Sequence, residues 1–272
     1  MNLGTDTGTY RGLSREEALT RLAGIGWTDV QISSGHLDDV RGDDVALADV
    51  RATCGRLGVT VRQVHSDAEL GPTTDDLDAN LRWLDITAAI GADCLITHAN
   101  GDADYNTEAE RQRCLALNRD CLSTVAERAD ALGVRVAIEN RLERPWATCR
   151  RFGARMQDFL DLIEAADAPG VGICLDTSHT RVARLSFADE IALAGPRLFA
   201  TQLSDSDGQT QHRMPFTLDI AWEEVITSLK AVGYDGLLTL DCGSTDASPD
   251  ALDAQLFAVA ERFALLLNDR GT

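Results

Sequence analysis

Polar side chains that could bind a metal or move a proton stand at or near the ends of apolar, strand-like runs of this sequence. Six runs carry such a side chain: His65, His98, Glu139, Asp176, Gln202 and Asp241. An ionised carboxylate desolvated at the end of a buried strand is costly unless it is paired, and a divalent cation is its strongest partner. Carboxylate and amide oxygens are hard ligands that suit Mn²⁺ or Mg²⁺ better than Zn²⁺. We therefore predict a divalent metal site, with Mn²⁺ favoured over Mg²⁺, Co²⁺ and Zn²⁺, whose ligands are Glu139, Asp176, Gln202 and Asp241.

The histidines near these carboxylates point to the same place. Taken singly, His65 and His98 are equally well explained as hydrogen-bonded core or loop residues, but their position at the ends of neighbouring runs favours a shared site. His179 stands three residues beyond Asp176, and His212 lies in the polar segment after the seventh run. Histidine ligands would make zinc or cobalt plausible again. Contacts to the substrate are predicted for five residues: His65, His98, His179, His212 and Arg213.

Purely structural interpretations compete with these roles. Asp176 could cap the helix or turn that follows its run. Glu139 has fewer such explanations, because glutamate is rarely buried without a partner. His36 lies in a polar loop and is expected to face solvent.

Eight apolar runs are predicted as strands, and each precedes a segment with apolar residues at helical spacing. The predicted strands are residues 3–8, 30–32, 59–65, 93–98, 134–139, 171–176, 197–203 and 236–241. The predicted helices are residues 14–24, 44–57, 74–90, 107–132, 154–166, 187–194, 221–232 and 249–267. The segment 14–17 (SREE) has the form of a capping box, and Gly133 is placed to end the fourth helix.

Strands that alternate with helices indicate a parallel sheet, and strands this apolar are buried on both faces. Eight units in 272 residues favour closure into a single (β/α)₈ TIM barrel, an α/β fold that fills residues 1–272 as one domain. The rival, a doubly wound open sheet, lacks a G-x-G-x-x-G motif after the first strand. In such a barrel the strand ends converge on one mouth, where the active site lies.

Composition limits the classes of partner. The chain has 44 acidic and 25 basic residues and a net charge of −19, which argues against a nucleic acid partner. No apolar run approaches the ~18 residues of a membrane span, and the N-terminus lacks a basic region followed by an apolar stretch, so a cytoplasmic protein is expected. The seven cysteines contain no C-x-x-C pair and are predicted to be reduced, mostly buried thiols. Barrel helices often form dimers or tetramers, so a homo-oligomer remains open.

Four segments resemble the signatures of a known superfamily. They are residues 136–140 (VAIEN), 174–179 (CLDTSH), 202–208 (QLSDSDG, followed by His212) and 233–241 (GYDGLLTLD). Together they resemble the xylose isomerase-like TIM-barrel superfamily, which contains sugar phosphate isomerases and epimerases and the endonuclease IV group. The resemblance spans roughly residues 20–245 and implies the same barrel.

The resemblance also implies roles for particular residues. In the epimerase branch, the positions that match Glu139 and Asp176 are metal ligands, the seventh-strand position is usually histidine and the eighth-strand position is usually glutamate. This chain has Gln202 and Asp241 there. Glutamine can still coordinate through its carbonyl oxygen, whereas aspartate is one methylene shorter and reaches less far as a base.

Residues and resemblance together predict a metal-dependent isomerase or epimerase that acts on a sugar, a sugar phosphate or a polyol-derived ketose. Glu139 would remove a proton next to a carbonyl to give an enediolate, and Asp241 would return a proton from the far side or only hold the metal. No glycine-rich loop or basic cluster near the last two strands indicates a phosphate site.

Three alternatives remain. An endonuclease IV-like phosphodiesterase would use the four strand-end and loop histidines, but the acidic charge and the glutamine at position 202 argue against it. A dehydratase or lyase could use the same site. A non-catalytic binding subunit would carry Gln202 and Asp241 as marks of lost activity.

Overall fold

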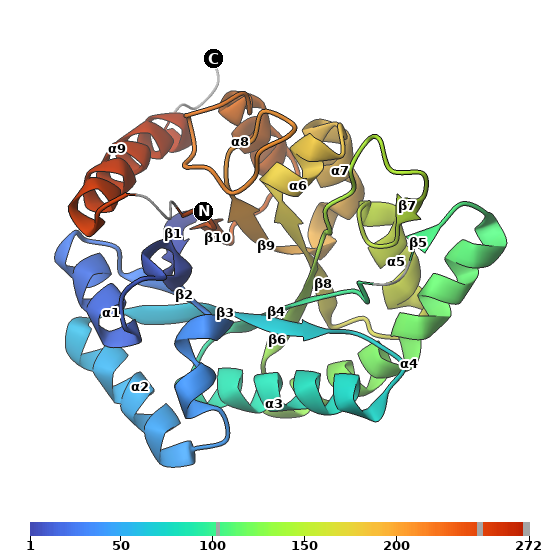
Figure 1. Ribbon diagram of the computed structural model, residues 1–272, viewed down its shortest axis with the longest axis horizontal. Coiled ribbons are helices and arrows are strands. Elements are labelled where there is room, and N and C mark those ends of the chain that lie inside the picture. Colours follow the sequence, from blue (N-terminus) through green and yellow to red (C-terminus); the bar gives the residue numbers. More distant parts are fainter. Residues whose placement is uncertain (102–103, 244–246, 269–272) are drawn as a thin grey trace.

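The apolar runs form eight parallel strands that close into a barrel surrounded by helices (Figure 1). The computed structural model describes residues 1–101, 104–243 and 247–268. The strands are β1 (Asn2–Asp6), β2 (Asp29–Ser33), β3 (Thr60–Glu69), β4 (Cys94–His98), β6 (Arg135–Glu139), β8 (Val171–Asp176), β9 (Leu198–Leu203) and β10 (Leu237–Leu240). Around the barrel their order is β1-β10-β9-β8-β6-β4-β3-β2, so neighbours in space follow the chain and β10 closes on β1. The predicted (β/α)₈ barrel is confirmed.

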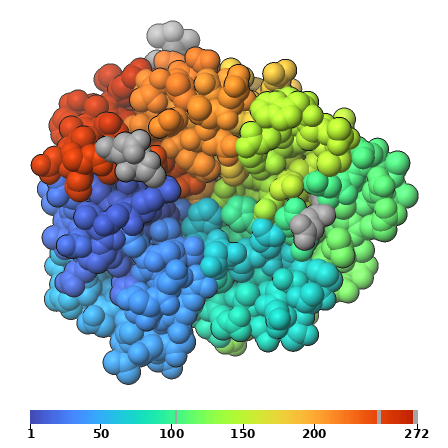
Figure 2. All heavy atoms as spheres, viewed as in Figure 1, coloured from blue at the N-terminus to red at the C-terminus, as the bar shows by residue number. Residues whose placement is uncertain are grey.

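Nine α-helices lie in the described part of the chain, and the units follow one another around the molecule in sequence order (Figure 2). They are α1 (Arg15–Gly24), α2 (Asp44–Leu57), α3 (Thr74–Ile90), α4 (Glu108–Leu132), α5 (Met156–Ala165), α6 (Thr177–Val182), α7 (Phe187–Ala194), α8 (Trp222–Ala231) and α9 (Pro249–Asn268). Local signals set several of their ends. Ser14 and Glu17 form the predicted capping box of α1, and Gly133 ends α4 in the left-handed conformation that favours glycine. Among the helices described, none combines the length and apolar character needed to cross a bilayer.

Four features differ from the sequence-based expectations. β1 ends at Asp6, because the chain turns there into the 3₁₀ helix η1 (Thr7–Tyr10), and β3 continues past His65 to Glu69 with an irregular register. A short antiparallel pair, β5 (Asp104–Tyr105) and β7 (Arg150–Arg151), joins two loops. Helix α6 follows β8 directly.

The prediction that His36 faces solvent is wrong. Its exposed fraction is 8%, and it lies in the 3₁₀ helix η2 (Ser34–His36) after β2. Its Nε2 is 3.1 Å from the carbonyl oxygen of Leu13, an acceptor, so the loop before α1 provides the hydrogen bond that permits burial.

The inside of the barrel contains both an apolar cluster and hydrogen-bonded polar side chains. A small apolar cluster, separate from the main core between sheet and helices, consists of Cys94, Ile96, Ala137, Cys174 and Ala200. Buried polar side chains also bond across the barrel. Gln31 on β2 pairs with Gln202 on β9, and Thr239 on β10 donates to Gln63 on β3 at 2.9 Å. These strands are not neighbours, so the bonds span the interior beneath the strand ends.

Candidate active site

Glu139, at the end of β6, is the centre of the site. Its side chain is 1% exposed, yet three histidines lie around its carboxylate. His65 Nε2 is 3.2 Å from Glu139 Oε2, and His98 Nε2 and His179 Nδ1 are 3.7 and 3.8 Å from Oε1. His98 and Glu139 are paired in register on adjacent strands, so the parallel ladder itself places them side by side.

Asp176 has one oxygen that caps a helix and one that is free. Its Oδ1 accepts the backbone N–H of His179 at 2.6 Å, which is the predicted capping interaction. Its Oδ2 is buried and has no hydrogen-bond partner among the described residues. The capping interpretation therefore accounts for half of this carboxylate and leaves the other oxygen for a ligand.

Two groups of side chains have the geometry to hold a cation. One consists of His65, His98 and Glu139, and the other of Asp176, His179 and His212; within each group the ligand atoms lie within 4.8 Å of one another. Among the described residues, three buried atoms of these groups lack a well-aligned hydrogen bond: His65 Nε2, Glu139 Oε2 and Asp176 Oδ2, of which the first two face each other at 3.2 Å. Buried polar atoms are rarely left unsatisfied, so their convergence suits one or two divalent cations.

Partners behind His179 and His212 set which ring nitrogen is available. His179 Nδ1 is 2.8 Å from the carbonyl oxygen of Asn140, and His212 Nδ1 is 3.2 Å from that of Asp241. Because a carbonyl oxygen only accepts, each Nδ1 carries a proton and each Nε2 is free to bind. Histidines that ligate metals are commonly held in this way.

The loop that carries His212 is anchored by Asp205, which lies in the signature segment 202–208 but was not predicted as a site residue. Asp205 is fully buried, and its carboxylate accepts from the backbone N–H groups of Thr217, Leu218 and Ile220. Its backbone also pairs with that of Arg213 in an isolated bridge. Arg213 is exposed and adjacent to His212, so its predicted contact with substrate stays a prediction.

The two remaining predicted metal ligands are Asp241 and Gln202. Asp241 follows β10, and its Oδ2 is 3.3 Å from His212 Nδ1. Gln202 is fully buried on β9, in register with Asp176, and its amide is bonded to Gln31. The four histidines predicted to bind substrate lie beside Glu139 or Asp176, in the two groups described above.

Electrostatic coupling favours charged histidines when no cation is bound. Burial disfavours the imidazolium of His65, but Glu139 outweighs it and raises the pKa of His65 to about 9. Burial is likewise outweighed at His212, where Asp241 and Asp176 raise the pKa to about 10. Burial would raise the pKa of Glu139, yet His65 and His98 hold it well below its usual range. Protons thus occupy positions that a cation would take.

We predict that the metal-free protein loses stability as the pH rises. The unfolded histidines titrate near 6.5, so the stabilisation from His65 and His212 is complete below that pH and is lost as the pH passes about 9 to 10. Thermal unfolding of the chelator-treated protein should show a fall in Tm on the order of 5–10 °C between pH 7 and 10. This fall is the contribution of the two histidines, and other titrating groups add their own changes. The metal-loaded protein should show a much smaller fall. Equal slopes for the two forms would contradict the pairing.

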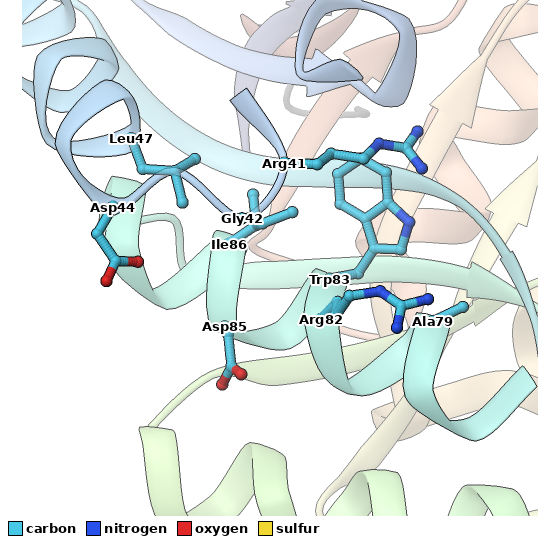
Figure 3. A pocket seen from close by; sticks show the side chains of 9 residues that line it. All are labelled: Arg41, Gly42, Asp44, Leu47, Ala79, Arg82, Trp83, Asp85 and Ile86. Carbon is cyan, nitrogen blue, oxygen red and sulfur yellow. The ribbon is translucent and has the colours of Figure 1, made fainter. Parts of the chain in front are cut away.

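A cavity outside the barrel does not belong to this site. It has a volume of about 200 Å³ and lies between α2 and α3, with Leu47 and Ile86 among its lining residues (Figure 3). The Arg41 guanidinium lies 4.4 Å from the centroid of the Trp83 ring and pairs with Asp67 at 2.8 Å. The lining residues of the cavity belong to α2, α3 and the loop before α2, whereas the titratable cluster lies at the strand ends.

The sequence matches the model of one protein family over most of its length. Residues 19–259 match the family model described as xylose isomerase-like TIM barrel. D-psicose 3-epimerase of Agrobacterium fabrum is 23% identical over 246 residues, which cover 82% of this chain and 77% of that protein. 3-Dehydroshikimate dehydratase of Pseudomonas aeruginosa is 28% identical over 204 residues, which cover 70% of this chain but only 28% of the longer dehydratase.

Solved structures share the fold at low sequence identity. A D-psicose 3-epimerase crystallised in the presence of D-fructose superposes with a TM-score of 0.80 at 17% identity, over 98% of this chain and 99% of that chain. 3-Keto-D-glucoside 4-epimerase from E. coli superposes with a TM-score of 0.78 at 14% identity, over 96% and 99% of the two chains. At these identities the superpositions establish a common fold.

Proposed function

The chain belongs to the xylose isomerase-like TIM-barrel family, and from that premise we propose that it is a divalent-metal-dependent sugar isomerase or epimerase. The observation that carries the proposal is the convergence of two buried carboxylates, Glu139 and Asp176, with four histidines, where Asp176 Oδ2 has no hydrogen-bond partner among the described residues. The similarity to sugar epimerases supports the same class of small-molecule substrate.

The residues present fit a divalent cation. Glu139 and Asp176 supply carboxylate oxygens, the histidines at 65, 98, 179 and 212 supply nitrogens, and Asp241 lies next to His212. A bound cation supplies Lewis acidity that polarises a substrate carbonyl and stabilises negative charge on an enediolate. The histidines widen the predicted choice of metal, so Co²⁺ and Zn²⁺ stand beside Mn²⁺ and Mg²⁺.

In this proposal two carboxylates move protons. Glu139 is ionised at neutral pH, since its pKa lies well below the usual range, and it accepts the proton next to the carbonyl. The pKa of Asp241 is also lowered: burial opposes ionisation, and the hydrogen bond with His212 overcomes it. Asp241 receives or returns the proton on the other side of the substrate. Glu139 ends β6 and Asp241 directly follows β10, and these two strands are separated by β8 and β9 in the barrel.

A test of the reaction class uses ketoses in D₂O. The metal-loaded protein, incubated with D-psicose, D-fructose or D-tagatose, should exchange a carbon-bound proton for deuterium, followed by NMR, and convert one sugar to another. Absence of exchange with a broad panel of ketoses, by protein that does hold metal, would overturn the sugar isomerase assignment.

We predict that Asp241→Asn separates exchange from epimerisation. The variant keeps Glu139, so deuterium should still enter the epimer whose proton faces Glu139, while conversion between epimers falls by about 10²-fold or more. Asp189→Asn, at an exposed position of α7, serves as the control. Equal loss of exchange and epimerisation would instead assign Asp241 to metal binding alone.

An endonuclease IV-like phosphodiesterase is the second candidate, and the two His and carboxylate groups favour it. The net charge of −19 opposes binding of a polyanion. Chelator-sensitive cleavage of an oligonucleotide with an abasic site would support this activity. A dehydratase, as in the Pseudomonas relative, would share the first proton abstraction. It would be recognised by a product that has one molecule of water less than the substrate.

A further inference from the structure

Two glutamines meet inside the barrel next to the candidate metal site. Gln31 on β2 and Gln202 on β9 come from strands that are not neighbours. Gln202 Nε2 donates to Gln31 Oε1 at 2.7 Å, and both side chains are fully buried. A side-chain amide can donate through its NH₂ group or accept through its carbonyl oxygen, so a neighbouring group must set the orientation of each glutamine.

Asp6, at the end of β1, sets the orientation of the Gln31 amide. Its Oδ2 accepts from Gln31 Nε2 at 2.6 Å, and its Oδ1 accepts the backbone N–H of Gly8. Both carboxylate oxygens of Asp6 are therefore acceptors in these two hydrogen bonds. Gln31 must therefore direct its nitrogen to Asp6 and its oxygen to Gln202.

The consequence is a defined orientation for Gln202. Its nitrogen is committed to Gln31, and its carbonyl oxygen has a single, 3.4 Å contact with Gln31 Nε2 among the hydrogen bonds of the described residues. Gln202 is in register with Asp176 on the adjacent strand, so the two side chains stand together on the inner face. Asp176 Oδ2 is the neighbouring acceptor without a partner.

We propose that Asp6 and Gln31 are positioning residues that fix the amide of Gln202 so that its carbonyl oxygen, and not its NH₂ group, is presented to a cation held at Asp176. The inference rests on the proposed function, because it requires that cation. The opposite amide orientation would direct N–H hydrogens at the metal and oppose binding. Partners behind a ligand commonly change metal affinity 10- to 100-fold, and here two residues form that support.

The test is Mn²⁺ affinity, measured by the EPR signal of free Mn²⁺, which does not depend on catalysis. Gln31→Met keeps an unbranched side chain of similar size and removes the hydrogen bonds of Gln31 to Asp6 and to Gln202, and we expect about 10-fold weaker binding. Gln63→Met is the matched control. Gln63 is the register partner of Gln31 and is equally buried, but it bonds to Thr239, so its variant should bind Mn²⁺ within about twofold of the wild type.

A double-mutant cycle separates positioning from general damage. In a Gln202→Met background, Gln31→Met should weaken Mn²⁺ binding no further, because the ligand that it orients is gone. If Gln31 variants do not fold, the same cycle is run with Asp6→Asn, where the effect of the lost charge is common to both backgrounds and cancels.

Two outcomes overturn the inference while the metal site stands. One is a Gln31→Met protein that binds Mn²⁺ as tightly as the wild type, and the other is an effect of equal size in the Gln202→Met background. A wild-type protein that binds no Mn²⁺ would overturn the Mn²⁺ site of the proposed function and this inference together.

Discussion

Replacement of Glu139 by glutamine should reduce the rate of carbon-bound proton exchange by about 10³-fold or more, the loss expected when a general base is removed. The substitution preserves size while it removes the group that accepts the proton and one carboxylate ligand. The measurement is solvent-deuterium exchange into a ketose that the wild-type protein turns over. Glu164→Gln, at an exposed position of α5, should leave the rate unchanged.

A second measurement on Glu139→Gln does not depend on activity. Glu139 is the main group that raises the pKa of His65, against the opposing effect of burial. Without that carboxylate, burial still lowers the pKa of His65 but Glu139 no longer raises it. An NMR titration of His65 in metal-free protein should therefore give a pKa that has fallen from about 9 toward or below 6.5. A variant that folds, keeps its exchange rate and loses the His65 shift would show that Glu139 is electrostatically coupled but is not the base.

Removal of the metal should abolish turnover and lower stability. The first ligand group comes from β3, β4 and β6, and the second from β8, α6 and the loop after β9, so a cation in either group would link elements far apart in the chain. At a metal concentration 1,000 times Kd, binding to the folded state alone contributes about 4 kcal/mol, which corresponds to a Tm change on the order of 10 °C. Chelation followed by dialysis, with activity and Tm measured before and after metal is returned, tests this prediction.

Elemental analysis of protein purified without a chelating step adds the stoichiometry. About one Mn, Mg, Co or Zn per chain would support the sugar isomerase proposal, and two or three Zn would favour the phosphodiesterase. His65→Ala and His212→Ala each remove one ligand from a different group, so a cation in only one group is affected by only one of them. If no metal binds even after incubation with Mn²⁺, both catalytic proposals fail and the binding-subunit alternative gains support.

Local sequence signals determined most of the secondary structure. The helix α3 (Thr74–Ile90) and the strand β8 (Val171–Asp176) have the predicted bounds, because apolar spacing, N-terminal caps and terminal glycines act within a few residues. The pair β5–β7 and the buried His36 were not foreseen. Both depend on contacts between segments that are distant in the sequence, for which a local pattern carries no signal.

The positions of Glu139 and Asp176 at strand ends could be predicted from the alternation of strands and helices in the sequence. Their convergence also follows, because a closed parallel barrel gathers those ends on one side. Tertiary structure alone decided the surroundings of these carboxylates. Closure places His65 against Glu139, the loop anchored by Asp205 brings His212 beside Asp241, and Gln202 meets Gln31 across the interior. Gln31 and Gln202 are 171 positions apart in the chain, so their pairing requires a closed barrel that brings non-adjacent strands within hydrogen-bonding distance.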